Sequence, residues 1–257
     1  MHVGGQDPVC TRLPPMLPLA ECALFLDFDG TLLGIGPSPD AVTVDAALRT
    51  LLADLSRRCG GALALVSGRR IAALDALLDP LKLAAAGVHG FERRNASGMI
   101  ATPEPPDRRS LEDARRRMER WVQAYPRLIL EDKEFSLALH YRALPSLEPG
   151  LVEAVTDMVA HKRGLKVQRG AMVVEIVPEG ADKGAAITEF MGETPFRGRQ
   201  PVYAGDDLTD EPAFERVNSA GGVSIGVGVA APTAARTRLG SVAELRAWLQ
   251  RLLQEQQ

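Results

Sequence analysis

A chain of 257 residues is long enough for one large domain or two smaller ones. Apolar residues make up 46% of it and charged residues 25%, and the net charge of −3 excludes the strongly basic chains that bind nucleic acid or membrane surfaces. Three cysteines without metal-ligand spacing fit a reducing compartment, and no apolar run is long enough to span a membrane. We therefore expect a cytoplasmic protein that binds neither nucleic acid nor a membrane, and we also expect a monomer.

The first twenty residues are expected to form a flexible N-terminal arm. Pro14, Pro15 and Pro18 interrupt any regular element there. The segment also lacks the basic start and the unbroken apolar stretch of a signal peptide. We assign the ordered part of the protein to the residues that follow.

Residues 23–26 form a short apolar run that leads directly into Asp27 and Asp29, followed by Gly30 and Thr31. Such a run is typical of a buried strand in a parallel sheet, and ligands bind beyond the carboxyl ends of these strands. Two carboxylates this close together repel each other unless a cation lies between them, and Mg²⁺ prefers oxygen ligands. An ordinary strand followed by an Asp-Gly turn is the alternative interpretation.

The next segment predicts a helix followed by a second strand. A helix is expected to begin near Thr43, which would act as its N-cap, and residues 62–66 predict a second parallel strand. Ser67 follows this strand directly. Its hydroxyl group could donate a hydrogen bond to a phosphoryl oxygen, or it could simply cap the helix that is expected near Ile71.

Residues 81–86 predict a third strand, which leads into a Gly-Val-His-Gly loop. His89 and Gly90 in this loop lie where a hydroxyl-rich ligand could approach the backbone closely. A purely structural histidine is the alternative, and the residues alone do not decide between the two.

The pattern changes after a proline-rich linker at residues 103–109. The segment up to residue 177 predicts the order helix, strand, strand, helix, strand, strand, which indicates an antiparallel sheet. We therefore expect an inserted α+β cap domain at residues 105–177 and a core domain at residues 21–104 and 178–257. Polar clusters flank the first strand pair of the insertion, and they could bind sugar hydroxyls or be solvated strand ends; they contain Glu131, Lys133, His140 and Arg142.

The core resumes after Pro178 with Asp182 as the expected N-cap of a helix. Lys183 would then lie in the first turn, where a cation opposes the helix dipole, and such a local conflict is typical of a functional site. Residues 201–204 predict a strand that delivers an acidic loop containing Asp206, Asp207 and Asp210. Residues 221–227 are expected to form the last core strand, and a capping box from Ser241 to Glu244 should start the final helix.

Taken together, the segments at these strand ends resemble the four motifs of the haloacid dehalogenase superfamily of phosphatases. The resemblance implies an α/β fold with a Rossmann-like parallel sheet core and an inserted cap. It also implies that Asp27 is the nucleophile, that Asp29 is the general acid and base, and that Ser67 and Lys183 hold the phosphoryl oxygens. Mg²⁺ is the implied cofactor, and the expected metal residues are Asp27, Asp29, Asp206 and Asp207, with Asp207 and Asp210 ordering the metal's surroundings or Lys183.

Finer details over about residues 23–230 resemble the trehalose-phosphatase family, including Ser-Gly-Arg at 67–69, Gly-x-His-Gly at 87–90 and Gly-Asp-Asp-x-Thr-Asp-Glu at 205–211. The resemblance implies hydrolysis of trehalose 6-phosphate through an aspartyl-phosphate. One departure is Val177, where the family often has a basic residue. The residues implied to bind the sugar phosphate are Gly68, Arg69, His89, Gly90, Glu131, Lys133, His140, Arg142 and Glu175.

Three alternatives remain open at this stage. The chain could be a phosphatase of the same superfamily that acts on another sugar phosphate, such as sucrose phosphate or mannosyl-glycerate phosphate. It could be a mutase, because a phosphoenzyme can return the phosphoryl group to a sugar. It could also be a non-catalytic sugar-phosphate sensor, although the intact acidic motifs argue against that function.

Overall fold

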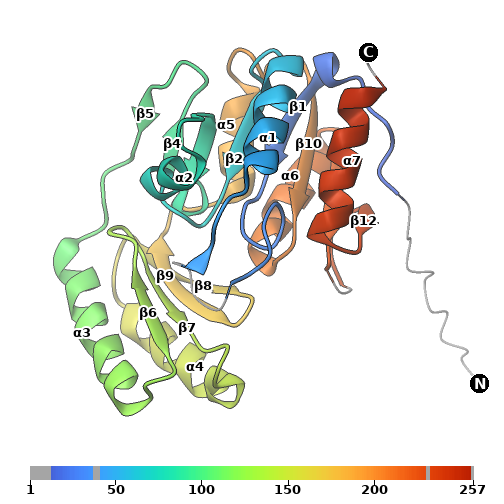
Figure 1. Cartoon of the computed structure of the whole chain (residues 1–257). Helices are drawn as coiled ribbons and strands as arrows, with labels where there is room; N and C mark the ends of the chain where they lie inside the picture. The colour runs from blue at the N-terminus through green and yellow to red at the C-terminus, as the bar shows by residue number, and fades with distance from the viewer. Residues whose placement is uncertain (1–12, 37–40, 230–231, 256–257) are drawn as a thin grey trace, which may run out of the picture.

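The computed structural model describes residues 13–36, 41–229 and 232–255. Residues 1–12 of the expected arm lie outside the described residues. Leu17 and Leu19 at the end of that arm are buried in the core, so packing begins before residue 20. The described part contains a large sheet and a smaller sheet, each covered by its own helices (Figure 1).

The large sheet has eight strands in the order β12-β11-β10-β1-β2-β3-β4-β5. The strands from β12 to β3 are parallel, and β4 and β5 extend the sheet in an antiparallel sense. Because β1 pairs with both β10 and β2, three carboxyl ends lie side by side at the centre of one edge. The bounds are β1 (Cys22–Leu26), β2 (Leu63–Val66), β3 (Ala84–Gly87), β4 (Glu92–Arg94), β5 (Ile100–Ala101), β10 (Gln200–Gly205), β11 (Val223–Val227) and β12 (Thr237–Leu239).

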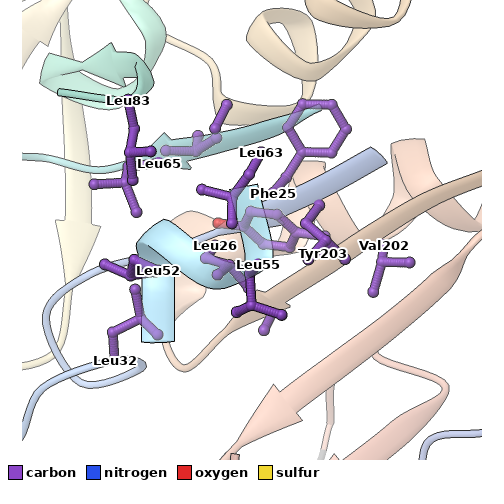
Figure 2. Packing of buried hydrophobic residues seen from close by; sticks show 14 of the residues in the cluster. Phe25, Leu26, Leu32, Leu52, Leu55, Leu63, Leu65, Leu83, Val202 and Tyr203 are labelled. Carbon is purple, nitrogen blue, oxygen red and sulfur yellow. The ribbon is translucent and has the colours of Figure 1, made fainter. Parts of the chain in front are cut away.

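Helices cover both faces of this sheet, which is why the central strand β1 is completely buried. Helix α1 packs against α7 on one face, and α5 packs against α6 on the other (Figure 1). Leu52 and Leu55 on the apolar stripe of α1 lie among side chains of β1 and β2 (Figure 2). The bounds are α1 (Ala46–Arg58), α2 (Ile71–Leu78), α5 (Lys183–Met191), α6 (Glu211–Ser219) and α7 (Val242–Gln254).

The smaller unit, residues 108–178, is called the cap below. Its four antiparallel strands have the order β6-β7-β9-β8, and together with two helices they enclose a separate apolar cluster around Met118, Val155 and Ile176. It lies beside the carboxyl ends of the large sheet (Figure 1). The bounds are α3 (Arg108–Ala124), β6 (Ile129–Asp132), β7 (Leu137–His140), α4 (Glu148–Val159), β8 (Leu165–Gly170) and β9 (Val173–Pro178).

Several predicted element boundaries were wrong. Helix α1 begins three residues after Thr43, because the Asp45 carboxylate accepts a hydrogen bond from the Leu48 amide at 2.6 Å and acts as the N-cap. The strand at 223–227 is not the last core strand, since β12 follows it. Strands β4 and β12 are three residues long and carry charged side chains, so neither has the apolar run on which the prediction relied.

The capping box predicted for α7 is only half formed. The Ser241 hydroxyl accepts a hydrogen bond from the Glu244 amide at 3.2 Å, as predicted. The Glu244 carboxylate accepts from the Gly240 amide instead of the Ser241 amide. None of the helices in the described part of the chain is both long enough and apolar enough to cross a membrane.

Candidate active site

A cavity of about 410 Å³ lies between the carboxyl ends of the central strands and the cap. Every residue proposed above for catalysis, metal binding or substrate binding lines this cavity, with the exception of Gly90. These residues come from segments as far apart in the sequence as residue 27 and residue 207. The structure therefore brings the predicted motifs together at one place.

Gly90 does not line the cavity, and the structure shows a packing role for it. Its φ angle is +101°, and a Cβ atom at this position would lie 2.6 Å from the backbone oxygen of Asp182. Glycine is therefore required for the close approach between the loop after β3 and the start of α5. Gly90 shapes the site through packing and does not line the cavity.

Asp27 lies at the tip of β1 and is almost completely buried. One of its carboxylate oxygens, Oδ1, accepts a hydrogen bond from Lys183 Nζ at 2.8 Å. Lys183 is the first residue of α5, where Asp182 caps the helix by accepting from the Ala185 amide at 3.0 Å. The helix cap thus fixes the lysine that pairs with the predicted nucleophile.

Asp210 is the centre of the polar network behind this pair. Its two oxygens accept hydrogen bonds from Lys183 Nζ at 2.6 Å, from Tyr203 Oη at 2.5 Å, and from the amides of Asp206 and Asp207 at 2.7 and 2.9 Å. Four donors use the full accepting capacity of a carboxylate. Asp210 is therefore an orienting residue for Lys183 and for the acidic loop, and little of its capacity is left for a metal ion.

A divalent cation fits the space between Asp27 and Asp206. Carboxylate oxygens of Asp27, Asp206 and Asp210 lie within 4.8 Å of one another. Burial raises the pKa of Asp27 well above its usual value, and burial together with the charge of Asp210 raises the pKa of Asp206 to about 6. Lys183 alone does not offset the charge of this carboxylate cluster, and hard oxygen donors suit a divalent metal ion.

The local backbone also holds Asp206 against the first motif. Thr31 Oγ1 donates a hydrogen bond to Asp206 Oδ1 at 2.8 Å. Gly30 has a φ angle of +85°, and a Cβ atom there would lie 2.0 Å from Asp206 Oδ2. Gly30 is therefore needed to accommodate Asp206, and Thr31 is needed to orient it.

Asp207 accepts hydrogen bonds from backbone amides, one of which belongs to the cap. Its Oδ1 atom accepts from the Leu208 amide at 2.6 Å, and its Oδ2 atom accepts from the Ala171 amide in the cap at 2.8 Å. A Cβ atom on Gly170 would lie 2.8 Å from the same Oδ2 atom. Asp207 thus links the acidic loop to the tip of the β8–β9 hairpin, and its role toward a metal stays a prediction.

Asp29 forms a bidentate ion pair with Arg69. The Arg69 guanidinium group donates to both oxygens of the Asp29 carboxylate, at 2.6 and 2.8 Å. The Ser67 hydroxyl accepts from the Arg69 amide at 3.1 Å and does not cap α2, because Glu92 accepts from the Ile71 amide at 3.2 Å instead. The alternative interpretation of Ser67 as a helix cap was therefore wrong.

Four residues of the cap and His89 of the core form a chain of polar contacts along the cavity. Glu175 Oε2 lies 3.3 Å from His89 Nε2 and accepts from Lys133 Nζ at 3.2 Å. Lys133 Nζ lies 3.8 Å from Glu131 Oε2, and the same oxygen lies 3.0 Å from His140 Nε2. Five residues that were predicted to bind sugar therefore form one continuous network.

Charge pairing decides the protonation states in this network. Burial alone would raise the pKa of Glu175, but the charge of Lys133 and the contact with His89 hold it well below its usual range. Burial alone would lower the pKa of Lys133, but Glu175 and Glu131 raise it. Burial lowers the pKa of His89. The network thus contains an ionised glutamate, a protonated lysine and a neutral histidine near neutral pH.

Sequence reasoning missed several residues of the cavity. Arg127, Thr209 and the apolar side chains of Ile35, Val42 and Ile129 line it as well. Thr209 belongs to the Gly-Asp-Asp-x-Thr-Asp-Glu motif but was given no role, and the other four stand in segments that indicate only a loop or an apolar strand. Thr31 could have been found, because it belongs to the same fixed motif as the two aspartates.

Comparisons with known proteins agree with this geometry. A family model described as trehalose-phosphatase matches residues 25–242. The trehalose-6-phosphate phosphatase of Escherichia coli K12 is 42% identical over 231 residues, which cover 90% of this chain and 86% of the relative. A probable trehalose-phosphate phosphatase of Sinorhizobium fredii is 39% identical over 226 residues, which cover 87% and 83% of the two chains.

Two solved structures share the fold. The crystal structure of a trehalose-6-phosphate phosphatase related protein aligns with a TM-score of 0.75 at 28% identity, covering 91% of this chain and 97% of the other. The C-terminal domain of a Candida albicans trehalose-6-phosphate phosphatase aligns with a TM-score of 0.81 at 20% identity, covering 94% and 99%. At the lower identity the likeness concerns the fold alone.

Proposed function

This chain belongs to the trehalose-phosphatase family, and on that premise we propose that it hydrolyses trehalose 6-phosphate to trehalose and inorganic phosphate in a Mg²⁺-dependent reaction. One observation supports this function most directly. The cavity has Asp27, Lys183 and Asp206 at one end and the network around Glu131 and Lys133 at the other. The first end suits phosphoryl transfer, and the second suits recognition of sugar hydroxyls.

We propose the following reaction, which the positions of the side chains support. The Asp27 carboxylate attacks phosphorus, the bond from phosphorus to the sugar oxygen breaks, and an aspartyl-phosphate forms. Asp29 donates a proton to the departing sugar oxygen and then takes a proton from the water that hydrolyses the aspartyl-phosphate. Ser67 and Lys183 donate hydrogen bonds to the phosphoryl oxygens, where negative charge develops.

Asp27, Asp206 and the backbone carbonyl of Asp29 would hold the metal ion. A bound Mg²⁺ supplies positive charge that offsets the carboxylates and polarises the phosphoryl group. The raised pKa values of Asp27 and Asp206 support this assignment, because a nearby cation stabilises the ionised form that burial disfavours.

The cap network would select the sugar. Glu131 and Glu175 can accept hydrogen bonds from sugar hydroxyls, and Lys133 can donate them. We propose that residues 105–177 act as a cap domain that closes over the core domain, residues 21–104 and 178–257, once the sugar is bound. Closure would keep water away from Asp27 during the first step.

The principal alternative is a phosphatase for another sugar phosphate, such as sucrose phosphate or mannosyl-glycerate phosphate. Val177 is the observation that favours it. This side chain is completely buried with Val88 and Phe91 and does not line the cavity, whereas the family often has a basic residue there. The sugar contacts near Glu175 can therefore differ from those of the relatives.

The test is phosphate release with and without Mg²⁺ from trehalose 6-phosphate, sucrose 6-phosphate, glucose 6-phosphate and p-nitrophenyl phosphate. A strong, metal-dependent preference for trehalose 6-phosphate is the expected result. Preference for another sugar phosphate would overturn the substrate but leave the chemistry of Asp27 in place. Release from none of the four would overturn the proposed function and favour a non-catalytic sensor.

A further inference from the structure

Most of the charged side chains that line the cavity are already paired with one another. Lys183 pairs with Asp27 and Asp210, Arg69 pairs with Asp29, and Lys133 pairs with Glu175. These cations are therefore engaged inside the site before any substrate arrives.

Two arginines that line the same cavity have no carboxylate partner among the described residues. Arg127 forms no ion pair or hydrogen bond within the described part of the chain, and Arg142 donates only to the backbone oxygen of Ala171, at 3.2 Å. Both side chains are exposed, whereas Lys133 and Lys183 deeper in the cavity are buried. The two unpaired guanidinium groups thus belong to the open part of the cavity.

Strand pairing places these arginines at the same end of the cap sheet. Ile129 at the start of β6 pairs with His140 at the end of β7. Arg127 lies two residues before β6, and Arg142 lies two residues after β7. Both therefore stand where the β6–β7 pair reaches the edge of the cavity.

The charges of the other residues that line the cavity indicate what these two arginines do. Apart from them, the cavity is lined by six carboxylates but only three permanently charged cations, Arg69, Lys133 and Lys183. A phosphate monoester is a dianion near neutral pH, so this interior repels it, and a single divalent cation offsets only part of that negative charge. Positive charge at the opening compensates for this repulsion during entry.

We infer, on the basis of the proposed function, that Arg127 and Arg142 form an entry site that captures the phosphate group of the substrate before it reaches Asp27. A guanidinium group presents paired donors that match the oxygens of phosphate. Exposed charges attract a ligand over about one Debye length, roughly 8–10 Å at moderate salt, so the entry site raises the local substrate concentration. Arg127 is thereby a substrate-binding residue. Arg142 contacts the phosphate group during entry, in addition to the sugar contact that was predicted for it.

This entry site makes a different prediction from a pair of sugar contacts. An electrostatic entry site acts on any phosphate monoester, and its effect weakens as salt is added. A sugar contact acts only on substrates that carry the sugar, and its effect does not depend on salt. The two possibilities can be separated with trehalose 6-phosphate and p-nitrophenyl phosphate over a range of ionic strength.

The experiment measures kcat and KM for Arg127→Gln, Arg142→Gln and the double variant with both substrates. We expect kcat/KM at low salt to fall about three- to ten-fold for each single variant and both substrates, with kcat nearly unchanged, and the deficit to shrink at high salt. Arg127→Lys keeps the charge and should retain most of the wild-type kcat/KM. Arg120→Gln is the matched control, because Arg120 lies in the same cap but lines a different cavity between α3 and α4.

Three results would overturn the inference. The variants could leave kcat/KM unchanged, they could impair only trehalose 6-phosphate, or their deficit could be independent of salt. Lack of turnover by the wild-type protein on every substrate would instead overturn the proposed function, so the two failures are distinguishable.

Discussion

Both carboxylate oxygens of Asp29 accept hydrogen bonds from the guanidinium group of Arg69, at 2.6 and 2.8 Å. Arg69 is only 12% exposed in its side chain, so this pair is held in a defined orientation. Arg69 therefore has a structural contact in addition to its predicted contact with substrate. Arg69 is a positioning residue for the group that we propose to protonate the departing sugar oxygen.

Replacing Arg69 by lysine tests this positioning. Arg69→Lys keeps the positive charge but loses the planar, bidentate geometry, so Asp29 gains rotational freedom. We expect kcat to fall at least about ten-fold, which corresponds to roughly 1.4 kcal/mol, while circular dichroism shows an intact fold. Equal kcat values for the variant and the wild type would show that Asp29 needs no such support.

Asp210 should matter for stability as well as for activity. Asp210→Asn places an amide NH₂ group among four donors and leaves the buried Lys183 with Asp27 as its remaining carboxylate partner. Breaking a buried ion pair costs about 3–5 kcal/mol, which should appear in the urea midpoint and in Tm. Asp113→Asn on the exposed face of α3 is the control, and its effect should stay within about 0.5 kcal/mol. A similar, small effect for both variants would contradict the central role of Asp210.

Metal binding should depend on pH through Asp206. Burial and the charge of Asp210 raise the pKa of this carboxyl from 3.8 to about 6. The folded protein therefore binds this proton more tightly than the unfolded chain, so the contribution of Asp206 to stability is full below about pH 4 and is lost as the pH rises through about 6. Above that pH the metal-free fold carries an uncompensated carboxylate.

A cation competes with the proton for the same oxygens. The increase in Tm on adding Mg²⁺ should therefore be small at about pH 5 and larger at about pH 7.5, and chelation should reverse it. Asp206→Asn should remove most of this increase at both pH values. An increase that is equal at both pH values, or that survives in Asp206→Asn, would place the metal elsewhere.

Lys133 is predicted to contribute both to sugar selection and to the stability of the network that contains Glu175. Lys133→Met leaves Glu175 buried with a neutral histidine, which should lower the free energy of unfolding by about 3–5 kcal/mol. It should also lower the ratio of trehalose 6-phosphate to p-nitrophenyl phosphate turnover. The double variant Lys133→Met, Glu175→Gln removes both charges and should recover stability without recovering this ratio. An unchanged ratio would show that Lys133 does not contact the sugar.

Much of the fold could be predicted because it depends on local patterns. The continuous apolar runs of β1, β2 and β10 mark strands that are buried on both faces, and Asp182 and Gly30 mark a helix start and a tight turn. Strands β4 and β12 could not be predicted in the same way. They are short, charged and stabilised by neighbours that lie far away in the sequence, so tertiary contacts decide their conformation.

The candidate site likewise has a part that local sequence patterns predict and a part that tertiary contacts decide. The identities of Asp27 and Asp206 follow from motifs at the ends of parallel strands, which lie together, and that of Lys183 follows from its place in the first turn of a helix. The partners of these residues do not follow, since the sequence cannot show that Arg69 binds Asp29 or that Asp207 accepts from the cap. The first of these contacts joins two loops of the core and the second joins the cap to the core, and both depend on tertiary packing that no local pattern encodes.

The central claim is that Asp27 forms the covalent intermediate. The most direct measurement is to quench the protein during turnover of trehalose 6-phosphate and to locate the phosphoryl group by peptide mass spectrometry. We predict a labelled peptide that contains Asp27 in the wild type, and neither label nor phosphate release in a folded Asp27→Asn variant. A phosphoryl group on another residue, or phosphate release by Asp27→Asn at a rate near that of the wild type, would contradict the account.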